Sequence, residues 1–434
     1  MASDLSFYLL LQAFSGSFDN SKTSALAALA VVSAASAQTS GLTISGYIDR
    51  GYTSVDNTDK TKNLKTLSSS AGTTSIFVKG TEDLGGGNVA GFSVESDWAE
   101  LDGNTQKSSY SAAQNAGFAN GESFISLANA NIGTLKLGAV NSFMLGNTTG
   151  VAAPSFSTGV GSAFSSNFSI FNGIGTGVTG NGGVGVLATN SAPVVSPAAV
   201  VAKGTTGARD IRIGNTFQYT TPMFSGFSAG VAYAAQNNNV TAQTNGAIET
   251  AGITGATPAG GNGNTVGMVE YALNYVNGPV KVIFDTIEYK VGSNGTAQVT
   301  GTAGASVATA LALNGNQTSR HNLLAASYAL LPQLTVNVGF GSFSSSNDLS
   351  KGNSVQAGAT YVIGAVDLMA NYATVNDTSA LNIDRKMFGL GANYNLSKTA
   401  RAYFRYDDIN YASNQAAYAG SVQKRTAVGI SKSF

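Results

Sequence analysis

Charged side chains are the residues of this chain most able to do chemistry, and they recur at alternate positions of short segments. In residues 400–411, Arg401, Arg405 and Asp407 alternate with alanine, phenylalanine and tyrosine. Because successive residues of a β-strand point to opposite faces, this spacing predicts strands with one charged and one apolar face. Rings of such charges select ions in a pore. The charged residues assigned to such faces are Asp49, Lys79, Arg212, Glu270, Asp367, Arg385, Arg401, Arg405 and Asp407.

Catalytic and metal chemistry find little support in the sequence. His321 is the only histidine and there is no cysteine, which excludes thiolate sites and any site with two histidines. A hydrolase with a Ser–His pair would have to use His321, which by parity faces the interior of a barrel. The glycine runs at 85–87 and 260–263 lack the Lys-Ser/Thr of a phosphate loop. We therefore expect no enzyme, no cofactor and no metal site, and a solvated or pore-lining His321.

A repeated tyrosine and turn indicates how these residues are positioned. Alternating runs end at Tyr219, Tyr275, Tyr328, Tyr361 and Tyr394, and each is followed by a short turn, a second alternating segment and a long polar stretch. Short turns that alternate with long loops are typical of an antiparallel transmembrane barrel with two unequal rims. Tyrosines at one height fit a lipid–water boundary.

Alternating segments long enough to cross the hydrocarbon, about 9–11 residues, recur along the chain. Apolar positions must face lipid, because no water there can solvate a charge, so the charged positions face a lumen wide enough for water. A soluble β-sandwich would reverse these faces. We expect an all-β, transmembrane antiparallel barrel of about sixteen strands, centred on 42–54, 73–83, 88–98, 122–130, 133–141, 210–221, 226–235, 265–276, 279–290, 320–330, 333–342, 353–362, 365–374, 385–395, 400–411 and 424–434.

The segment 142–209 is the longest stretch without strand alternation. It contains Pro154, Pro193 and Pro197. A structureless stretch of this length in a compact fold is usually functional or disordered. The simplest interpretation is a loop that folds into the lumen and narrows it, and the alternative is an extracellular flap. The other long loops are expected at 100–121, 236–264, 291–319 and 343–352.

The amino terminus resembles an export signal. Lys22 precedes an apolar stretch at 23–32 that is too short to span a bilayer, and Ala35-Ser36-Ala37 before Gln38 fits a small-x-small cleavage site. We expect residues 1–37 to be a signal region cleaved between Ala37 and Gln38. Residues 1–20 are interpreted as an over-long start and residues 21–37 as the signal peptide. Residues 38–434 form a single barrel domain in this interpretation.

Six further segments resemble sequence motifs of a known protein family. They are LTISGYID at 42–49, KGTEDLG at 79–85, IGTLKLG at 132–138, RIGNTFQYTTPMFSGF at 212–227, YNLSKTARAY at 394–403 and TAVGISKSF at 426–434. Together they resemble the general trimeric porins of Gram-negative outer membranes, in particular the subgroup whose mature chains open Thr-Leu-Tyr-Gly-x-x-Asp. The segment 212–227 is the most specific, since it is similar to the family's Arg-x-x-Asn-Ser-x-x-Tyr-x-Ser-Pro-x-Phe-x-Gly-Phe.

The resemblance implies a sixteen-stranded homotrimer in the cell outer membrane, with a third loop in the pore and passive diffusion of small hydrophilic solutes and ions. It also implies contact with outer-membrane lipid and lipopolysaccharide. The terminal Phe434 resembles the signal read by the barrel-assembly machinery. Neither nucleic acid nor a cofactor is expected as a partner.

The departures from the family concern pore charge. Aligned positions of the family's wall arginines hold Ser75, Gly121 and Ala139, and the long loop has no Asp or Glu between Ser142 and Ala208. We therefore expect only a weak anion preference.

Two interpretations of the remaining lumen charges stay open. Arg401 and Arg405, with Lys79 and Arg212, could form a cationic track, or they could be plain solvated charges, with Arg405 neutralised by Asp407. A substrate-selective channel is the nearer alternative function, and its aromatic surface would come from Phe143, Phe156, Phe164, Phe168 and Phe171. A structural or adhesive barrel is the more distant one.

Overall fold

The structure is a computed structural model of the whole chain, and a subset of its residues is placed well enough to describe. These are residues 40–57, 64–98, 119, 121–154, 156, 159–162, 212–234, 265–292, 317–345, 351–378, 383–413 and 421–434. The expected signal region 1–37 and half or more of each predicted long loop lie outside this set. Within it, no helix is both long and apolar enough to cross a membrane.

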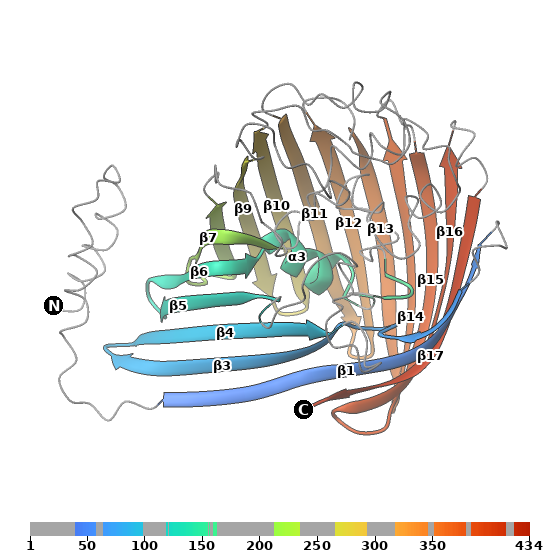
Figure 1. The fold of residues 1–434 in the computed structure, drawn as a ribbon, viewed down its shortest axis with the longest axis horizontal. Coiled ribbons are helices and arrows are strands. Elements are labelled where there is room, and N and C mark those ends of the chain that lie inside the picture. Colours follow the sequence, from blue (N-terminus) through green and yellow to red (C-terminus); the bar gives the residue numbers. More distant parts are fainter. Residues whose placement is uncertain are drawn as a thin grey trace, which may run out of the picture.

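The described elements are almost all strands (Figure 1). The first half of the sheet contains β1 (Ser40–Asn57), β2 (Leu64–Ser68), β3 (Thr74–Gly85), β4 (Asn88–Trp98), β5 (Ser123–Asn129), β6 (Gly133–Asn141), β7 (Arg212–Thr220) and β8 (Phe227–Ala234). The second half contains β9 (Thr265–Asn277), β10 (Val280–Gly292), β11 (Gln317–Leu331), β12 (Leu334–Ser345), β13 (Lys351–Ile363), β14 (Val366–Asp377), β15 (Ile383–Asn395), β16 (Ala400–Ser413) and β17 (Ser421–Ser433). Two short helices, α3 (Phe143–Asn147) and η3 (Thr148–Ala152), follow β6.

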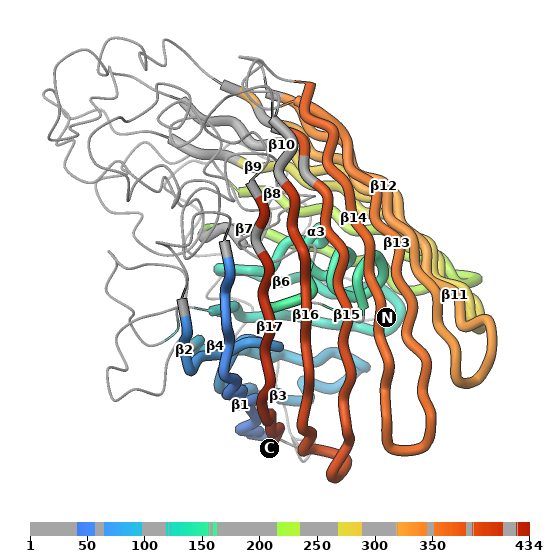
Figure 2. The backbone as a smooth tube through the Cα atoms, turned by 90° about the vertical axis from the view of Figure 1, so that its right-hand side faces the viewer, coloured from blue at the N-terminus to red at the C-terminus, as the bar shows by residue number. Residues whose placement is uncertain are grey.

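The strands close into one antiparallel barrel. From β3 onward each strand pairs with the next. The last strand, β17, pairs with the Tyr47–Asn57 part of β1, so that β15, β16, β17 and β1 lie side by side (Figure 2). The short β2 and the long β3 both pair with β1, along Gly51–Val55 and Ser40–Tyr47 respectively, and share one position in the wall. The seventeen strands therefore make a sixteen-position barrel, which confirms the predicted fold class. The short β2 was not predicted.

Alternation along each strand separates the two faces of the wall. In β14, Leu368 and Tyr372 are 43% and 48% exposed, whereas Met369, Asn371 and Ala373 between and after them are buried. The apolar, exposed set is the outer face. Since a closed barrel leaves no unpaired strand edge, this face can meet hydrocarbon without unsatisfied backbone groups.

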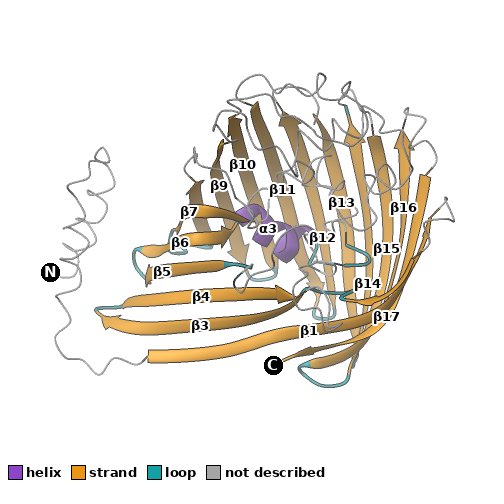
Figure 3. Cartoon of the chain, in the orientation of Figure 1, coloured by secondary structure: helices purple, strands orange, loops and turns teal. Residues whose placement is uncertain are grey.

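The short turns and the tyrosines mark one rim. Short turns, drawn in teal in Figure 3, connect β3–β4, β5–β6, β7–β8 and every second pair after them. The repeat tyrosines lie next to these turns, since Val280 pairs with Tyr328 and Val366 pairs with Tyr394 at the strand ends. They alternate with the inward residues, and Tyr328 and Tyr394 are 41% and 55% exposed on the outer face. The predicted recurrence of these tyrosines at one rim is thus confirmed in the described strands, and their position at a lipid–water boundary stays a prediction.

The last residue of the chain completes the seam of the barrel. The backbone N–H of Gly46 donates to the Phe434 carbonyl at 3.0 Å, and the Phe434 N–H donates to the Gly46 carbonyl at 3.1 Å. The phenyl ring of Phe434 lies over Gly46, where an added Cβ would stand 2.4 Å from the ring and 2.8 Å from the Ser75 carbonyl. Glycine is required here because the ring occupies the space of a side chain.

Substitution of Gly46 by alanine is therefore expected to destabilise the seam between β1 and β17. The added methyl group forces the Phe434 ring off Gly46, at a cost of about 1–3 kcal/mol for overpacking. Gly41→Ala is the matched control on the same strand, since its Cβ would lie 3.4 Å from the nearest atom. The temperature at which the folded barrel loses its compact electrophoretic mobility measures the effect. Equal unfolding temperatures for the two variants would contradict the assignment.

Candidate functional site

The chain leaves the wall after β6 and runs through the inside of the barrel. Ser142 begins this segment, α3 and η3 follow, and α3 lies within the curve of the wall in front of β10 to β12 (Figure 3). We name residues 142–154, 156 and 159–162 the constriction loop. For these residues the predicted folding into the lumen is confirmed, and the extracellular flap is wrong. Residues 163–211 lie outside the described part of the chain.

The first turn of the constriction loop is bound by a carboxylate of the wall. Glu270 of β9 is fully buried and accepts hydrogen bonds from the N–H groups of Phe143 at 3.0 Å and Met144 at 2.7 Å. The Ser142 hydroxyl accepts a third bond from the Leu145 N–H at 3.0 Å. These N–H groups have no partner within α3, so Glu270 and Ser142 supply the acceptors that a helix start lacks.

From α3 onward, polar side chains of successive strands bind the constriction loop. The Asn147 amide donates to Asp285 of β10 at 3.0 Å. The Ala152 carbonyl accepts from Asn337 of β12 and from Gln356 of β13, the latter at 2.7 Å. A backbone segment inside a barrel has no sheet partner, so the wall must supply these bonds.

The end of the constriction loop is held in the same way. The Gly161 carbonyl accepts from the Asn371 amide of β14 at 3.2 Å, and the Gly161 N–H donates to Asp407 of β16 at 2.7 Å. The Val160 N–H donates to the Ser70 carbonyl at 2.8 Å, which joins the loop to the turn before β3. The constriction loop thus follows the inner wall from β9 to the seam beside β1.

Glycines in the wall make room for the loop. A Cβ on Gly230 of β8 would lie 2.4 Å from the Phe143 ring, and one on Gly391 of β15 would lie 2.8 Å from the Phe156 ring. Phe143 and Phe156 therefore pack against the wall, and Phe156 is only 2% exposed. Phe156 is therefore closed to a solute, whereas Phe143 packs against Gly230 but is partly exposed.

Several predicted pore-lining residues face inward but are covered. Asp49 is fully buried and accepts from the N–H groups of Ser70, Ala71 and Gly72 at 2.6, 2.7 and 3.1 Å. Glu270 is covered by α3. Both carboxylates hold backbone segments and cannot contact a permeating ion directly.

Arg405 and Asp407 are also inward and buried, but they do not pair with each other. The Asp407 carboxylate binds Arg425 of β17, whose Nε is 2.9 Å from Oδ1. The Arg405 guanidinium donates to the Asn393 amide oxygen at 2.8 Å and lies 5.7 Å from the Phe156 ring centroid. The predicted pairing of Asp407 with Arg405 is wrong, because the neighbouring strand brings Arg425 directly opposite Asp407.

Lys79, Asp367 and Arg401 remain in contact with the lumen. Lys79 is exposed, and Asp367 and Arg401 are partly exposed. The amides of Asn393 and Asn395 donate to the Asp367 carboxylate at 3.1–3.2 Å.

Two further predicted residues, Arg212 and Arg385, have side chains outside the described set. For Arg212 the alternation itself is interrupted, because a bulge at Asn215, with φ of 57°, shifts the register between β6 and β7 by one residue. Parity counted across Asn215 therefore does not carry to Arg212.

Sequence reasoning missed two lumen-facing lysines. Lys136 of β6 lies opposite the inward-facing Ser126, 3.7 Å from Glu122 and 4.4 Å from the Phe124 ring centroid. Lys281 of β10 shares the inward parity of Asp285 and is exposed. Alternation could have identified Lys281, which follows the Pro279 turn directly. Lys136 stands between Leu135 and Leu137, so the same alternation could have identified it.

Of the three positions at which the resemblance implies a wall arginine, Ser75 and Gly121 are closed by their neighbours and Ala139 is partly exposed. A Cβ on Gly121 would lie 2.3 Å from Cγ of Glu95, and Ser75 is 3% exposed.

His321 faces inward as predicted but is buried against Phe343, with ring centroids 6.4 Å apart. No group of three or more metal-ligating side chains occurs among the described residues.

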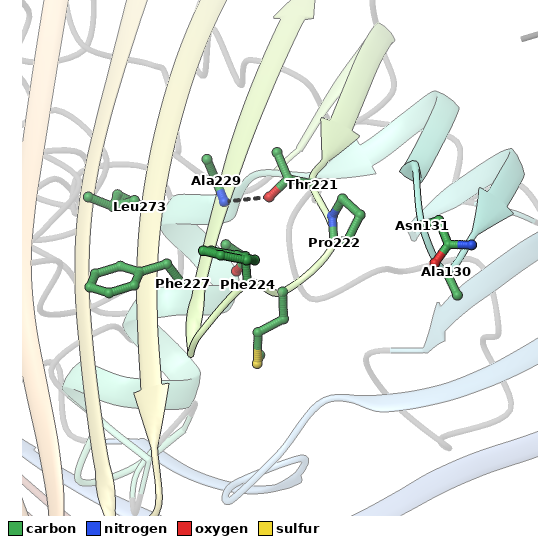
Figure 4. A pocket seen from close by; sticks show the side chains of 10 residues that line it. Ala130, Asn131, Thr221, Pro222, Phe224, Phe227, Ala229 and Leu273 are labelled. Carbon is green, nitrogen blue, oxygen red and sulfur yellow. Dashed lines mark hydrogen bonds between the residues drawn. The ribbon is translucent and has the colours of Figure 1, made fainter.

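A hollow of about 560 Å³ lies outside the lumen, at the rim of short turns (Figure 4). Pro222, Phe224, Phe227 and Leu273 line it, and Phe224 is 80% exposed. Because Phe227 and Leu273 belong to the outer face, this hollow opens away from the lumen.

Comparison with known proteins agrees with this architecture. A family model described as Gram-negative porin matches residues 24–414. No curated protein matches the chain. Similar solved structures include an anion-selective porin from Comamonas acidovorans, with 22% identity, a TM-score of 0.63, and coverage of 91% of this chain and 100% of that one. OmpT of Vibrio cholerae in its trimer form has 12% identity, a TM-score of 0.54, and coverage of 91% and 99%. OmpF of Salmonella typhi, solved with daunomycin, has 14% identity, a TM-score of 0.54, and coverage of 91% and 97%.

Removal of the Glu270 carboxylate is expected to loosen the constriction loop. Glu270→Ala leaves the N–H groups of Phe143 and Met144 without acceptors and removes two bonds to a charged group, each contributing about 1.5–3 kcal/mol. Single-channel recording should then show a larger and noisier conductance. Glu288→Ala is the control, because Glu288 pairs with Arg320 on the outer face. Identical conductance and noise in both variants would show that Glu270 does not hold the loop.

Proposed function

This chain belongs to the Gram-negative porin family, and we propose that its water-filled pore passes small hydrophilic solutes by passive diffusion with a weak preference for anions. As a member of this family it is an outer-membrane channel. The proposal concerns the ion preference of this pore and its assembly into oligomers.

The observation that carries the anion preference is an unequal exposure of acids and bases. The inward carboxylates Asp49, Glu270, Asp285 and Asp407 are each fully buried. By contrast, Lys79 and Lys281 are exposed and Arg401 is partly exposed. Arg405 and Arg425 are buried as well. Among the exposed or partly exposed inward groups that the structure describes, the cations outnumber the acids only slightly: they are Lys79, Lys136, Lys281 and Arg401 against Asp83, Glu122 and Asp367.

The constriction loop supports a weak preference rather than a strong one. Its described residues carry no charge, so the narrowing itself adds no ring of one sign. The lumen cations act through water, and exposed charges are screened over about 10 Å at 0.1 M salt. The preference should therefore decline as salt concentration rises.

The anion-selective porin of Comamonas acidovorans has the same fold, and the anion selectivity in its name agrees with the ion preference proposed for this chain. Residues 42–49 resemble the mature start of one porin subgroup, and this resemblance supports the proposal that the chain is a general porin. No enzymatic role is proposed.

A substrate-selective channel was the nearer alternative. Its distinguishing feature would be open aromatic faces on the loop, but Phe143 and Phe156 pack against Gly230 and Gly391. Phe164, Phe168 and Phe171 lie outside the described residues. We therefore favour the general pore.

We propose further that the protein is a homotrimer, exported with cleavage between Ala37 and Gln38 and inserted by the barrel-assembly machinery through Phe434. The trimer form of Vibrio cholerae OmpT, a protein of the same fold, supports the first point. The ordered pairing of Phe434 with Gly46 supports the last. The apolar outer face is suited to lipid, and we propose lipopolysaccharide as its partner in the outer leaflet.

The charge proposal predicts the result of a reversal-potential measurement across a potassium chloride gradient. The wild-type pore should give a potential of the sign for anion preference, and Lys79→Gln with Arg401→Gln should move it toward zero. Lys386→Gln is the matched control, since this exposed lysine has the outward parity of Phe388. Cation preference in the wild type, or an equal shift in the control, would refute the role of the lumen cations.

The assembly proposal predicts a mass of three chains. The molar mass of the detergent-solubilised protein, measured by light scattering during size-exclusion chromatography and corrected for detergent, should be that of a trimer. A monomer in mild detergent at micromolar concentration would count against it. Amino-terminal sequencing of the same sample should begin at Gln38.

A further inference from the structure

Two lumen-facing cations lie beside aromatic rings on the wall near the barrel seam. The Arg401 guanidinium carbon is 5.9 Å from the centroid of the Tyr47 ring. The Lys79 ammonium is 5.0 Å from the centroid of the Phe77 ring. A cation within about 6 Å of an aromatic face is attracted by the electron-rich centre of the ring.

The four side chains form one strip across neighbouring strands. Tyr47 of β1 lies opposite Ser75 of β3, and Ser45 lies opposite Phe77. Tyr47 and Phe77 are therefore diagonal neighbours on the lumen face, with backbones about 7–8 Å apart. We name Arg401, Tyr47, Phe77 and Lys79 the seam strip.

Arg401 is fixed at one end of the seam strip. It reaches from β16 across β17, where its Nε donates to the Ser431 hydroxyl at 3.1 Å and its Nη2 donates to the Tyr47 hydroxyl at 3.1 Å. These partners are neutral, so the bonds orient the guanidinium without cancelling its charge. Arg401, Tyr47 and Phe77 are partly exposed and Lys79 is exposed, so all four can meet a solute.

The charges of the seam strip are not neutralised within the described residues. No described carboxylate lies within ion-pair distance of Arg401 or Lys79. Of the acids on the same part of the wall, Asp49 and Asp97 are 0% and 7% exposed, whereas Asp367, bonded by the Asn395 amide opposite Arg401, is partly exposed and Asp83 of β3 is exposed. Lys136 offers a comparison, because it also lies over a ring but stands 3.7 Å from Glu122. Open cations beside open rings are thus a property of the seam strip.

We propose that the seam strip is a binding site for small organic anions that carry an aromatic ring. The carboxylate of such a solute pairs with Arg401 or Lys79, and its ring contacts Tyr47 or Phe77. Chloride and aliphatic carboxylates use only the cations. This inference rests on the proposed function, since it requires a water-filled lumen that admits anions.

The test compares benzoate with cyclohexanecarboxylate, which have the same charge and carbon count but differ in aromaticity. Each acid is added to purified wild-type protein in a planar bilayer, and the concentration that halves the chloride current is measured. Because one aromatic contact strengthens binding roughly threefold to tenfold, benzoate should act at a correspondingly lower concentration.

Phe77→Leu should remove most of the difference between the two acids while chloride conductance stays at the wild-type level. Phe124→Leu is the matched control, because this ring lies beside the neutralised Lys136 and its loss should leave the difference intact. Arg401→Gln should weaken the block by both acids to a similar extent. Heat-modifiable mobility verifies that each variant is folded, and Phe77→Ile provides a second ring-free variant.

Two outcomes would overturn the site: equal block by the two acids in the wild type, or an undiminished benzoate preference in both ring-free Phe77 variants. These differ from failure of the proposed function, in which the wild-type protein would show no chloride conductance or would prefer cations. A wild-type pore that prefers anions yet treats both acids alike would refute the seam strip alone.

Discussion

The structure depends on one constraint: a chain segment that leaves the sheet inside a barrel must replace the hydrogen bonds it gives up. The inner wall meets this need with acceptors and donors on successive strands. Glu270 binds the start of the constriction loop, Asn337 and Gln356 bind its middle, and Asp407 binds its end. An unmade bond at any of these buried places would cost about 1–3 kcal/mol. The position of the loop, and hence the narrowing of the lumen, follows from this requirement.

The same constraint decides which charges a solute meets. Carboxylates accept several hydrogen bonds from backbone N–H groups and are therefore the wall residues best suited to hold a loop. Asp49 with three such bonds and Glu270 with two are removed from the lumen by that role. Lysine and arginine cannot accept hydrogen bonds, and Lys79 and Arg401 remain at the water surface. Arg405 and Arg425 are buried instead, because they donate to Asn393 and Asp407. The structural use of Asp49 and Glu270 thus removes two negative charges from the surface that a solute meets.

Alternation in the sequence was enough to predict the barrel, its sixteen positions and the inward faces of residues such as Asp367 and Arg401. It could not predict burial, because covering Asp49 or Glu270 depends on backbone segments distant in sequence. It also failed where the register changes: the bulge at Asn215 breaks the parity that leads to Arg212. The partner of Asp407 required the register of β16 with β17, which the residues 414–420 between them do not specify in the sequence.

The pairing of Gly46 with Phe434 has a consequence for the order of folding. Hairpins such as β13–β14 join neighbouring residues, whereas the β1–β17 seam joins Tyr47 to Ser433 across almost the whole chain. The entropy lost on closing so large a loop is recovered only when the intervening strands already lie in sequence. The seam is therefore the last part of the wall to form, and until then β1 and β17 present two open strand edges that could pair with other chains. A nascent molecule is most vulnerable to aggregation in that interval, which ends only when its final residue reaches its place.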